Sequence, residues 1–236
     1  MSRRESPSGY EGLRVGFTAA VSHELRTPLA RLLSLLDTAK LPGVDVDELI
    51  EEACAEVVEM TQLVDDILFL SELEQGREVV ALGFTELAPY VAELYAESHE
   101  RALRAELALE SDVPAGLVVP LRPRMVRVVL GNLLDNALRY AGRGATFRIA
   151  ARQEGDAVLL EVSDDGAGVN PADVPRLFER FFRSDRSRTT RGTGLGLAIV
   201  KHIITAADGT VEVEGALGEG TRFRFALPAP RAARII

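Results

Sequence analysis

Apolar residues recur at helical spacing over the first third of the chain, and this periodicity constrains the fold more than any other feature. At about 100° per residue, the apolar positions between Leu13 and Lys40 fall on one stripe of a helix. The segment "LPGVD" at 41–45 then breaks the helix, and a second apolar stripe runs from Leu49 to Leu68. Two amphipathic helices with a short connection predict a helical hairpin. Because one hairpin would leave its apolar stripe in water, we expect two copies to pair as a dimeric four-helix bundle.

The first helix carries a histidine on the side opposite its apolar stripe. His23 lies about 160° from Leu25 on the helical wheel, so its imidazole is expected to face solvent or a partner, as is Thr27. Imidazole is a good nucleophile near neutral pH, and the adjacent Glu24 can hold or accept the proton on the second ring nitrogen. Pro28 bends the helix at a cost of about 3 kcal/mol. A lone surface histidine is commonly just solvated, but this cost and the motifs downstream favour a functional one.

The composition excludes several classes of protein. The net charge is −9, from 36 acidic and 27 basic residues, which argues against a nucleic-acid binder. Cys54 is the single cysteine, so no internal disulfide is possible and a reducing, cytoplasmic location is expected. No window approaches the roughly 20 apolar residues that cross a bilayer, so we expect no membrane segment in this chain, although it would fit the inner, cytoplasmic part of a longer membrane protein.

The pattern changes after "SELEQGRE" at 71–78, where helices begin to alternate with short strands. Helices mixed with a largely antiparallel sheet predict an α/β sandwich, so the whole chain is expected to be of the α+β class. The expected helices cover about 86–103, 123–141 and 194–207, and the expected strands lie near 105–110, 116–120, 145–152, 157–163, 209–214 and 221–227.

The helix at 123–141 contains "NLLDNALRY", which places four polar side chains on one stripe. Asn132, Asn136, Arg139 and Tyr140 are spaced i, i+4, i+7 and i+8, whereas the leucines between them face the other side. Asparagine amide oxygens are hard, neutral ligands that suit Mg²⁺ already carried by phosphates. Taken alone, this stripe is equally consistent with an exposed polar face.

Three glycine clusters follow the asparagine helix. In "VSDDGAGV" at 162–169 the glycines let the backbone pass close to a flat ligand, and Asp164 could accept a hydrogen bond from an exocyclic amine such as that of adenine. In "RGTGLGLAIVK" at 191–201 the glycines precede a helix, a favourable place for phosphate. "GEGTRFRF" at 218–225 is the third cluster. One such cluster is weak evidence, but three together favour a nucleotide site.

Together these segments resemble a sensor histidine kinase of bacterial two-component systems. "FTAAVSHELRTPL" resembles the phosphoacceptor box, "NLLDNALRY" the N box, "DDGAG" the first glycine box, "LFERFFR" at 177–183 the phenylalanine box, and "GTGLGLAIV" and "GEGTRF" the remaining glycine boxes. The resemblance implies a linker or disordered segment at 1–12, a dimerisation and phosphotransfer domain at 13–75, an ATP-binding domain of the gyrase and histidine kinase type at 76–228, and a tail at 229–236.

The resemblance also implies roles for individual residues. His23 would attack the γ-phosphate of ATP, Glu24 would act as acid or base, and Thr27 would orient water when the response regulator is dephosphorylated. The homodimer would pass its phosphoryl group to an aspartate in the receiver domain of that regulator. Asn136 would hold Mg²⁺, assisted by Asn132, and Thr221 would support Asp164 through water. Residues from about 170 to 193 would form a lid. The residues expected to contact the nucleotide are Asn132, Asn136, Arg139, Tyr140, Asp164, Gly166, Gly168, Gly192, Gly194, Leu195, Gly196 and Thr221.

Three positions depart from the pattern of this family. Arg139 stands where lysine is usual, Arg122 precedes Pro123 where an acidic residue is common, and Arg191 replaces a frequent glycine. Two other functions stay open: a dimeric ATP-sensing scaffold without turnover, and a serine kinase or gyrase-like ATPase of the same superfamily. The hairpin that carries His23 distinguishes a histidine kinase from the serine kinase and from the gyrase-like ATPase, because neither of those proteins has such a hairpin.

Overall fold

The computed structural model describes residues 7–76, 83–184 and 192–229, and of residues 7–19 it gives the backbone only. The chain forms two compact units. The first contains the described residues up to Leu68 together with Gly192 and Thr193, and the second contains the rest, from Phe69 onward. The division therefore falls before the expected domain boundary at residue 75. No helix within the described ranges is both long and apolar enough to cross a membrane.

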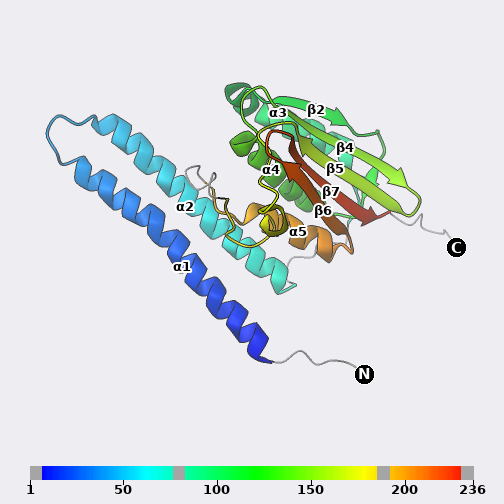
Figure 1. Cartoon of the computed structure of the whole chain (residues 1–236), viewed down its shortest axis with the longest axis horizontal. Coiled ribbons are helices and arrows are strands. Elements are labelled where there is room, and N and C mark those ends of the chain that lie inside the picture. The colour runs from blue at the N-terminus through cyan, green and yellow to red at the C-terminus, as the bar shows by residue number, and fades with distance from the viewer. Residues whose placement is uncertain (1–6, 77–82, 185–191, 230–236) are drawn as a thin grey trace. The chain divides into compact units, whose positions relative to one another are not determined.

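The helical hairpin consists of α1 (Pro7–Thr38) and α2 (Val46–Glu74) (Figure 1). Helix α1 begins before the expected Leu13, so residues 7–12 are helical rather than part of a linker, and it continues through Pro28. The start of α2 is set by Asp45, whose Oδ1 accepts hydrogen bonds from the backbone N–H groups of Asp47 (3.1 Å) and Glu48 (3.2 Å). Such a side chain satisfies amides that lack a partner within the helix.

The hairpin buries one of its charged side chains but leaves several of its apolar side chains exposed. Arg31 of α1 donates to Glu56 of α2 at 3.2 Å, and the Glu56 side chain is only 5% exposed. The apolar stripes, by contrast, stay partly in water. Several large apolar side chains of this unit are exposed, namely Leu29, Leu33, Leu36, Ile50, Val57, Val58, Val64 and Leu68.

The second unit contains a five-stranded sheet in the order β2-β4-β5-β7-β6. Neighbouring strands are antiparallel except for the pair β2 and β4, which is parallel. The expected strand near 116–120 lies outside this sheet, because β3 (Val118–Val119) pairs with the short β1 (Thr85–Glu86). The strands of the main sheet are β2 (Ala108–Asp112), β4 (Thr146–Glu154), β5 (Ala157–Asp164), β6 (Thr210–Ala216) and β7 (Gly220–Pro228).

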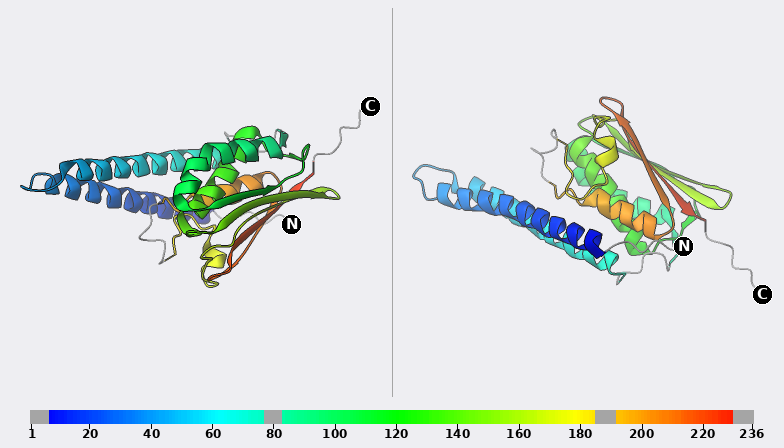
Figure 2. Two further views of the ribbon diagram at one scale, coloured as in Figure 1. Left: turned by 90° about the horizontal axis from the view of Figure 1, so that it is seen from above. Right: turned by 60° about the horizontal axis from the view of Figure 1, so that its bottom comes forward.

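Three helices cover one face of this sheet, and no other helix that the structure describes in this unit covers the opposite face (Figures 1 and 2). They are α3 (Leu87–Ala105), α4 (Pro123–Tyr140) and α5 (Gly196–Ala206), and a short 3₁₀ helix, η1 (Val174–Arg176), precedes α5. Alternate residues of the central strands are buried beneath the helices, which is the period-two pattern of a half-buried sheet. The expected α+β class with an α/β sandwich is therefore confirmed.

Helix α4 lies in the middle of this arrangement and buries the side expected from the sequence. Leu130, Leu133, Leu134 and Ala137 are each at most 3% exposed, whereas Leu138 is only half-buried. This packing fixes the rotation of α4 about its axis. As a result, the stripe that begins with Asn132 lies along the edge of the core.

Candidate functional site

His23 lies on the surface of α1, with a side chain that is 75% exposed. Its Nδ1 is 3.3 Å from Oε1 of Glu24, and the Thr27 hydroxyl donates to the His23 carbonyl at 3.4 Å. When Nδ1–H donates to the carboxylate, Nε2 is left with its lone pair directed to solvent. The segment therefore presents an imidazole that is oriented by an adjacent acid and open to an electrophile.

The polar stripe of α4 contains two asparagines in different situations. Nδ2 of Asn132 donates to the carbonyl oxygen of Val128 at 2.8 Å. The Asn136 carboxamide is half-buried and forms no hydrogen bond with the residues that the structure describes. Tyr140 is half-buried and Arg139 is exposed on the same stripe. Asn136 thus keeps its amide oxygen available to a ligand, as a magnesium ligand must.

Asp164 ends β5 opposite Thr221 of β7. Burial raises the pKa of the Asp164 carboxyl, although hydrogen bonds from the Gly166 amide (3.1 Å) and from the backbone and hydroxyl of Thr221 act in the opposite direction. Thr221 lies opposite Asp164 on the neighbouring strand, where its expected role is to support this carboxylate. A partly desolvated carboxylate that accepts a hydrogen bond from the Gly166 amide is a well-oriented acceptor for a further N–H group.

The neighbouring aspartate has a different environment. Asp165 is exposed, and its Oδ1 accepts a hydrogen bond from the Thr146 backbone N–H at 2.6 Å. The bond joins the start of β4 to the end of β5. The sequence "DDG" does not reveal that Asp165 bonds to the Thr146 backbone while Asp164 bonds to the Gly166 amide, since both aspartates precede the same glycine.

Glycines of the first glycine box pack closely against the backbone of neighbouring segments just after the end of β5. A Cβ added to Gly166 would lie 2.1 Å from the carbonyl oxygen of Ala141, at the end of α4. Gly168 has φ +64°, and its added Cβ would lie 1.8 Å from the Ala216 carbonyl oxygen. The space that the sequence suggested for a flat ligand is therefore filled, at these two α-carbons, by the backbone of neighbouring segments.

The second glycine box leads into α5. Gly194 has φ +68° and packs against the backbone of Phe181, whose N–H donates to the Gly194 carbonyl at 2.9 Å. Leu195 is fully buried and supplies no side-chain cap to the helix. The first backbone amides of α5, which begins at Gly196, therefore have no side-chain acceptor from the N-cap residue, as suits a phosphate site.

The phenylalanine box is anchored to the same unit by its aromatic rings. Phe178 packs edge-on against Phe223 of β7 at a centroid distance of 6.1 Å, and the Arg176 guanidinium lies 4.3 Å from the ring centre of Phe182. Of the expected lid at 170–193, residues 185–191 lie outside the described ranges. Gly192 belongs to the first unit, as do His23, Glu24 and Thr27, whereas the other expected nucleotide contacts belong to the second.

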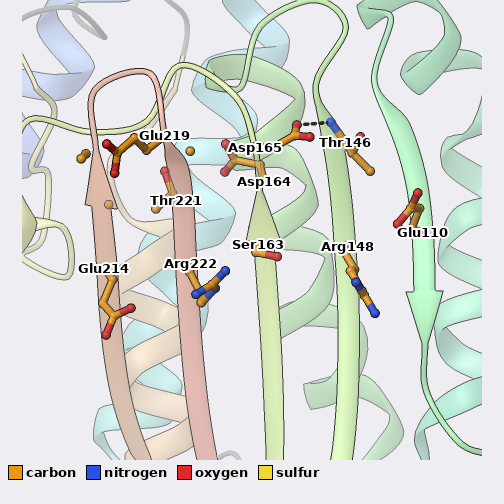
Figure 3. Close-up of a pocket in the computed structure, with 13 residues that line it drawn as sticks. Glu110, Thr146, Arg148, Ser163, Asp164, Asp165, Glu214, Glu219, Thr221 and Arg222 are labelled. Atoms are coloured by element: carbon orange, nitrogen blue, oxygen red, sulfur yellow. Dashed lines mark hydrogen bonds between the residues drawn. The ribbon is translucent and has the colours of Figure 1, made fainter.

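A hollow of about 650 Å³ opens on the helix-free face of the sheet (Figure 3). Ser163 lies there between Arg148 and Arg222, each of which pairs with a carboxylate: Arg148 with Asp112 at 2.9 Å and Arg222 with Glu161 at 3.4 Å. Asp164 also lines the hollow, but strand alternation directs its side chain to the helix-covered face. The hollow is thus a charged surface whose lining includes both Asp164 and Thr221.

Comparisons with known proteins cover both units. Residues 13–76 match the His Kinase A (phospho-acceptor) domain, and residues 122–231 match the Histidine kinase-, DNA gyrase B-, and HSP90-like ATPase family. Sensor-like histidine kinase SenX3 of Mycobacterium tuberculosis is 36% identical over 225 residues, which cover 93% of this chain and 55% of SenX3. The chain spans about half the length of the curated relatives it matches.

Solved structures show the same architecture. Histidine kinase AdeS of Acinetobacter baumannii has a TM-score of 0.72 at 26% identity, over 89% of this chain and 98% of AdeS. Full-length ShkA in complex with AMPPNP has a TM-score of 0.65 at 25% identity, over 97% of this chain and 47% of ShkA. A phospho-acceptor hairpin followed by an ATPase sandwich defines a protein-histidine kinase. The chain belongs to the sensor histidine kinases, of which it contains the catalytic core.

Proposed function

We propose that the second unit binds ATP, that the chain phosphorylates itself on His23, and that the phosphoryl group then passes to an aspartate in the receiver domain of a response regulator. The observation that carries the proposal is the exposed His23 imidazole, with Nδ1 3.3 Å from Glu24, in a chain that also contains the ATPase domain of its family. Nothing else in the first unit offers an oriented nucleophile of this kind among the described side chains.

The chemistry follows from the tautomer that Glu24 favours. Nε2 attacks the γ-phosphorus, the N–P bond forms, and the bond from phosphorus to the β–γ bridging oxygen breaks as ADP leaves. Glu24 then takes the Nδ1 proton, which leaves a neutral phosphoimidazole. Phosphate on an imidazole nitrogen is a high-energy phosphoramidate, so onward transfer to a carboxylate is favourable. Thr27, one turn along, would orient water for the reverse task of removing phosphate from the regulator.

The nucleotide site is proposed on the helix-covered side of the second unit. Asp164, supported by Thr221, would accept a hydrogen bond from the adenine amine, and the amides that begin α5 would face the phosphates. Arg139 and Tyr140 would contact phosphate or ribose. The co-crystallisation of the relative ShkA with AMPPNP supports a ligand of the ATP class.

Mg²⁺ fits the residues present in this part of α4. Asn136 offers a neutral amide oxygen that makes no hydrogen bond with the described residues, which is the type of donor that supplements phosphate oxygens around Mg²⁺. When bound, the ion would neutralise charge on the transferred phosphate. The planar guanidinium of Arg139, in place of the usual lysine, would add bidentate phosphate contacts.

We also propose that the chain acts as a homodimer in the cytoplasm. The exposed apolar side chains of α1 and α2, among them Leu33 (63% exposed) and Val58 (69% exposed), would be covered by a second hairpin. Sedimentation equilibrium tests this directly. A chain that stayed monomeric at micromolar concentration would contradict it.

Incubation with γ-labelled ATP and Mg²⁺ tests the central proposal. We expect an acid-labile, base-stable label that disappears in His23→Gln and persists in the matched control His99→Gln, because His99 is exposed on α3 away from the motifs. A label that survives His23→Gln would contradict the assignment. Nucleotide binding without any label would instead support the scaffold without turnover.

A further inference from the structure

Both polar atoms of the Asn132 carboxamide, Nδ2 and Oδ1, lie close to specific neighbours. Its Nδ2 donates to the carbonyl oxygen of Val128 at 2.8 Å, one turn earlier in α4. Fixing the nitrogen fixes the direction of Oδ1, which faces the first residue of α5. A Cβ added to Gly196 would lie 2.3 Å from this oxygen and 3.2 Å from Cγ of the same side chain. The two helices therefore approach each other through an amide and an α-carbon.

Gly196 has no conformational reason to be glycine. Its φ is not positive, unlike that of Gly194 two residues earlier. The three atoms nearest to its added Cβ all belong to Asn132. The missing side chain is thus explained by one neighbour, and a larger residue would have to displace Asn132 or move the start of α5.

We infer that Asn132 is a positioning residue that holds the N-terminus of α5 against α4, and that Asn136 alone supplies the amide ligand to the metal. The inference rests on the proposed nucleotide site and deepens it. It also replaces the shared role in which Asn132 assists at the metal, because the two amides have different partners. Asn132 acts on phosphate through the α5 amides that it keeps in place.

The spacing of the two asparagines supports this division. Four residues of helix rise by about 6 Å, so Asn136 lies one turn along the same face from the contact with Gly196. A fixed contact at Asn132 sets the distance between that face of α4 and the α5 amides. A displacement of about 1 Å between groups that hold one substrate can cost on the order of 100-fold in rate or affinity.

The contact itself is tested by thermal unfolding of the full chain. Gly196→Ala should lower the melting midpoint, since the added methyl group overlaps Oδ1 of Asn132. The matched control is Gly131→Ala, at a helical glycine whose added Cβ meets nothing within 4 Å, and it should raise the midpoint because alanine favours helix. In an Asn132→Ala background, Gly196→Ala should no longer lower the midpoint. Equal losses in both backgrounds would overturn the contact.

The separate roles are tested by the affinity of a fluorescent ATP analogue, trinitrophenyl-ATP, in excess Mg²⁺ and in EDTA. For Asn136→Ala we expect the affinity to fall only in Mg²⁺, so that the ratio of the two dissociation constants approaches one. For Asn132→Ala and Gly196→Ala we expect losses of about tenfold or more in both buffers, so that the ratio stays as in the unchanged chain.

Each result decides something different. If Asn132→Ala removes the Mg²⁺ dependence as Asn136→Ala does, Asn132 is a metal ligand and the inference is wrong while the nucleotide site stands. If Asn132→Ala binds the analogue as tightly as the unchanged chain in both buffers, it positions nothing. If the unchanged chain binds the analogue in neither buffer, the proposed nucleotide site fails and the inference fails with it.

Discussion

Gly220→Ala is the substitution for which the structure gives the most definite expectation. Gly220 begins β7 with φ +80°, and an added Cβ would lie 1.9 Å from the carbonyl oxygen of Asp164 and 2.8 Å from Cα of Asp165. These neighbours are backbone atoms of the adjacent strand, so no side-chain rotation can relieve the overlap. The position also bears on the proposed nucleotide site, because the next residue, Thr221, lies opposite Asp164 on the neighbouring strand.

Two terms set the size of the effect. A residue other than glycine at this φ costs about 1–2 kcal/mol. The contact adds more, since real Cβ atoms essentially never come within 3.0 Å of such neighbours and the strands must separate by about 1 Å. Overpacking of this kind costs about 1–3 kcal/mol. We therefore expect Gly220→Ala to lower the free energy of unfolding by about 2–5 kcal/mol.

Gly218 in the same hairpin provides the matched control. It has φ +79°, but its added Cβ meets nothing within 4 Å, so Gly218→Ala should lose only the conformational term, about 1–2 kcal/mol. Urea unfolding of both variants measures the difference, and trinitrophenyl-ATP binding should be weakened in Gly220→Ala far more than in Gly218→Ala. Equal destabilisation by the two substitutions would refute the steric argument.

Three further predictions concern other parts of the chain. Thr27→Ala should leave labelling of His23 intact and weaken dephosphorylation of the regulator, so full phosphatase activity in that variant would contradict the role of Thr27. Because burial raises the pKa of Asp164, acidification should protonate this carboxylate before an exposed aspartate and weaken analogue binding. Asp164→Asn should lack this fall in affinity. If the pH profile of binding were the same in Asp164→Asn as in the unchanged chain, Asp164 would be excluded as the titrating group. Arg31→Ala should destabilise the hairpin by about 1–3 kcal/mol, because it removes a charged partner of the buried Glu56 carboxylate. Lys40→Ala breaks an exposed pair with Asp37 and should change the melting midpoint little. Equal shifts would show that the burial of Glu56 is unimportant.

Much of the fold follows from local patterns in the sequence. The helical periodicity locates α1 and α2, and each expected helix and strand of the second unit has an observed counterpart with shifted ends, whereas the short β1 and η1 were not expected. The apolar side of α4 is visible in the spacing of its leucines. Local patterns fail where pairing is long-range: β3 joins β1 instead of the main sheet, and β2 runs parallel to β4. Neither strand's partner can be inferred from residues near it.

The start of α1 shows the limit of compositional signals. Residues 7–12 contain Pro7, Gly9 and Gly12, which suggest a break, yet the helix begins at Pro7. Proline is compatible with the first turn of a helix, because the N–H that it lacks has no acceptor there. The two glycines cost helix propensity of only about 1 kcal/mol each, which a long helix can absorb.

The glycine boxes show most clearly what a sequence motif leaves open. Their positions predict a nucleotide site, but their α-carbons meet protein atoms that lie far away in the chain: Gly166 meets Ala141, Gly168 meets Ala216, and Gly196 meets Asn132. Gly166 and Gly168 therefore approach backbone atoms at a distance that a larger residue does not allow, and at Gly196 a larger residue would have to displace the Asn132 side chain. These contacts hold the end of β5 and the start of α5 in place. The loss of nucleotide binding in a glycine-box variant is then as much a loss of framework as of ligand contact. Measuring the stability of the nucleotide-free chain separates the two causes, because a glycine that served the ligand alone could be replaced without cost in its absence.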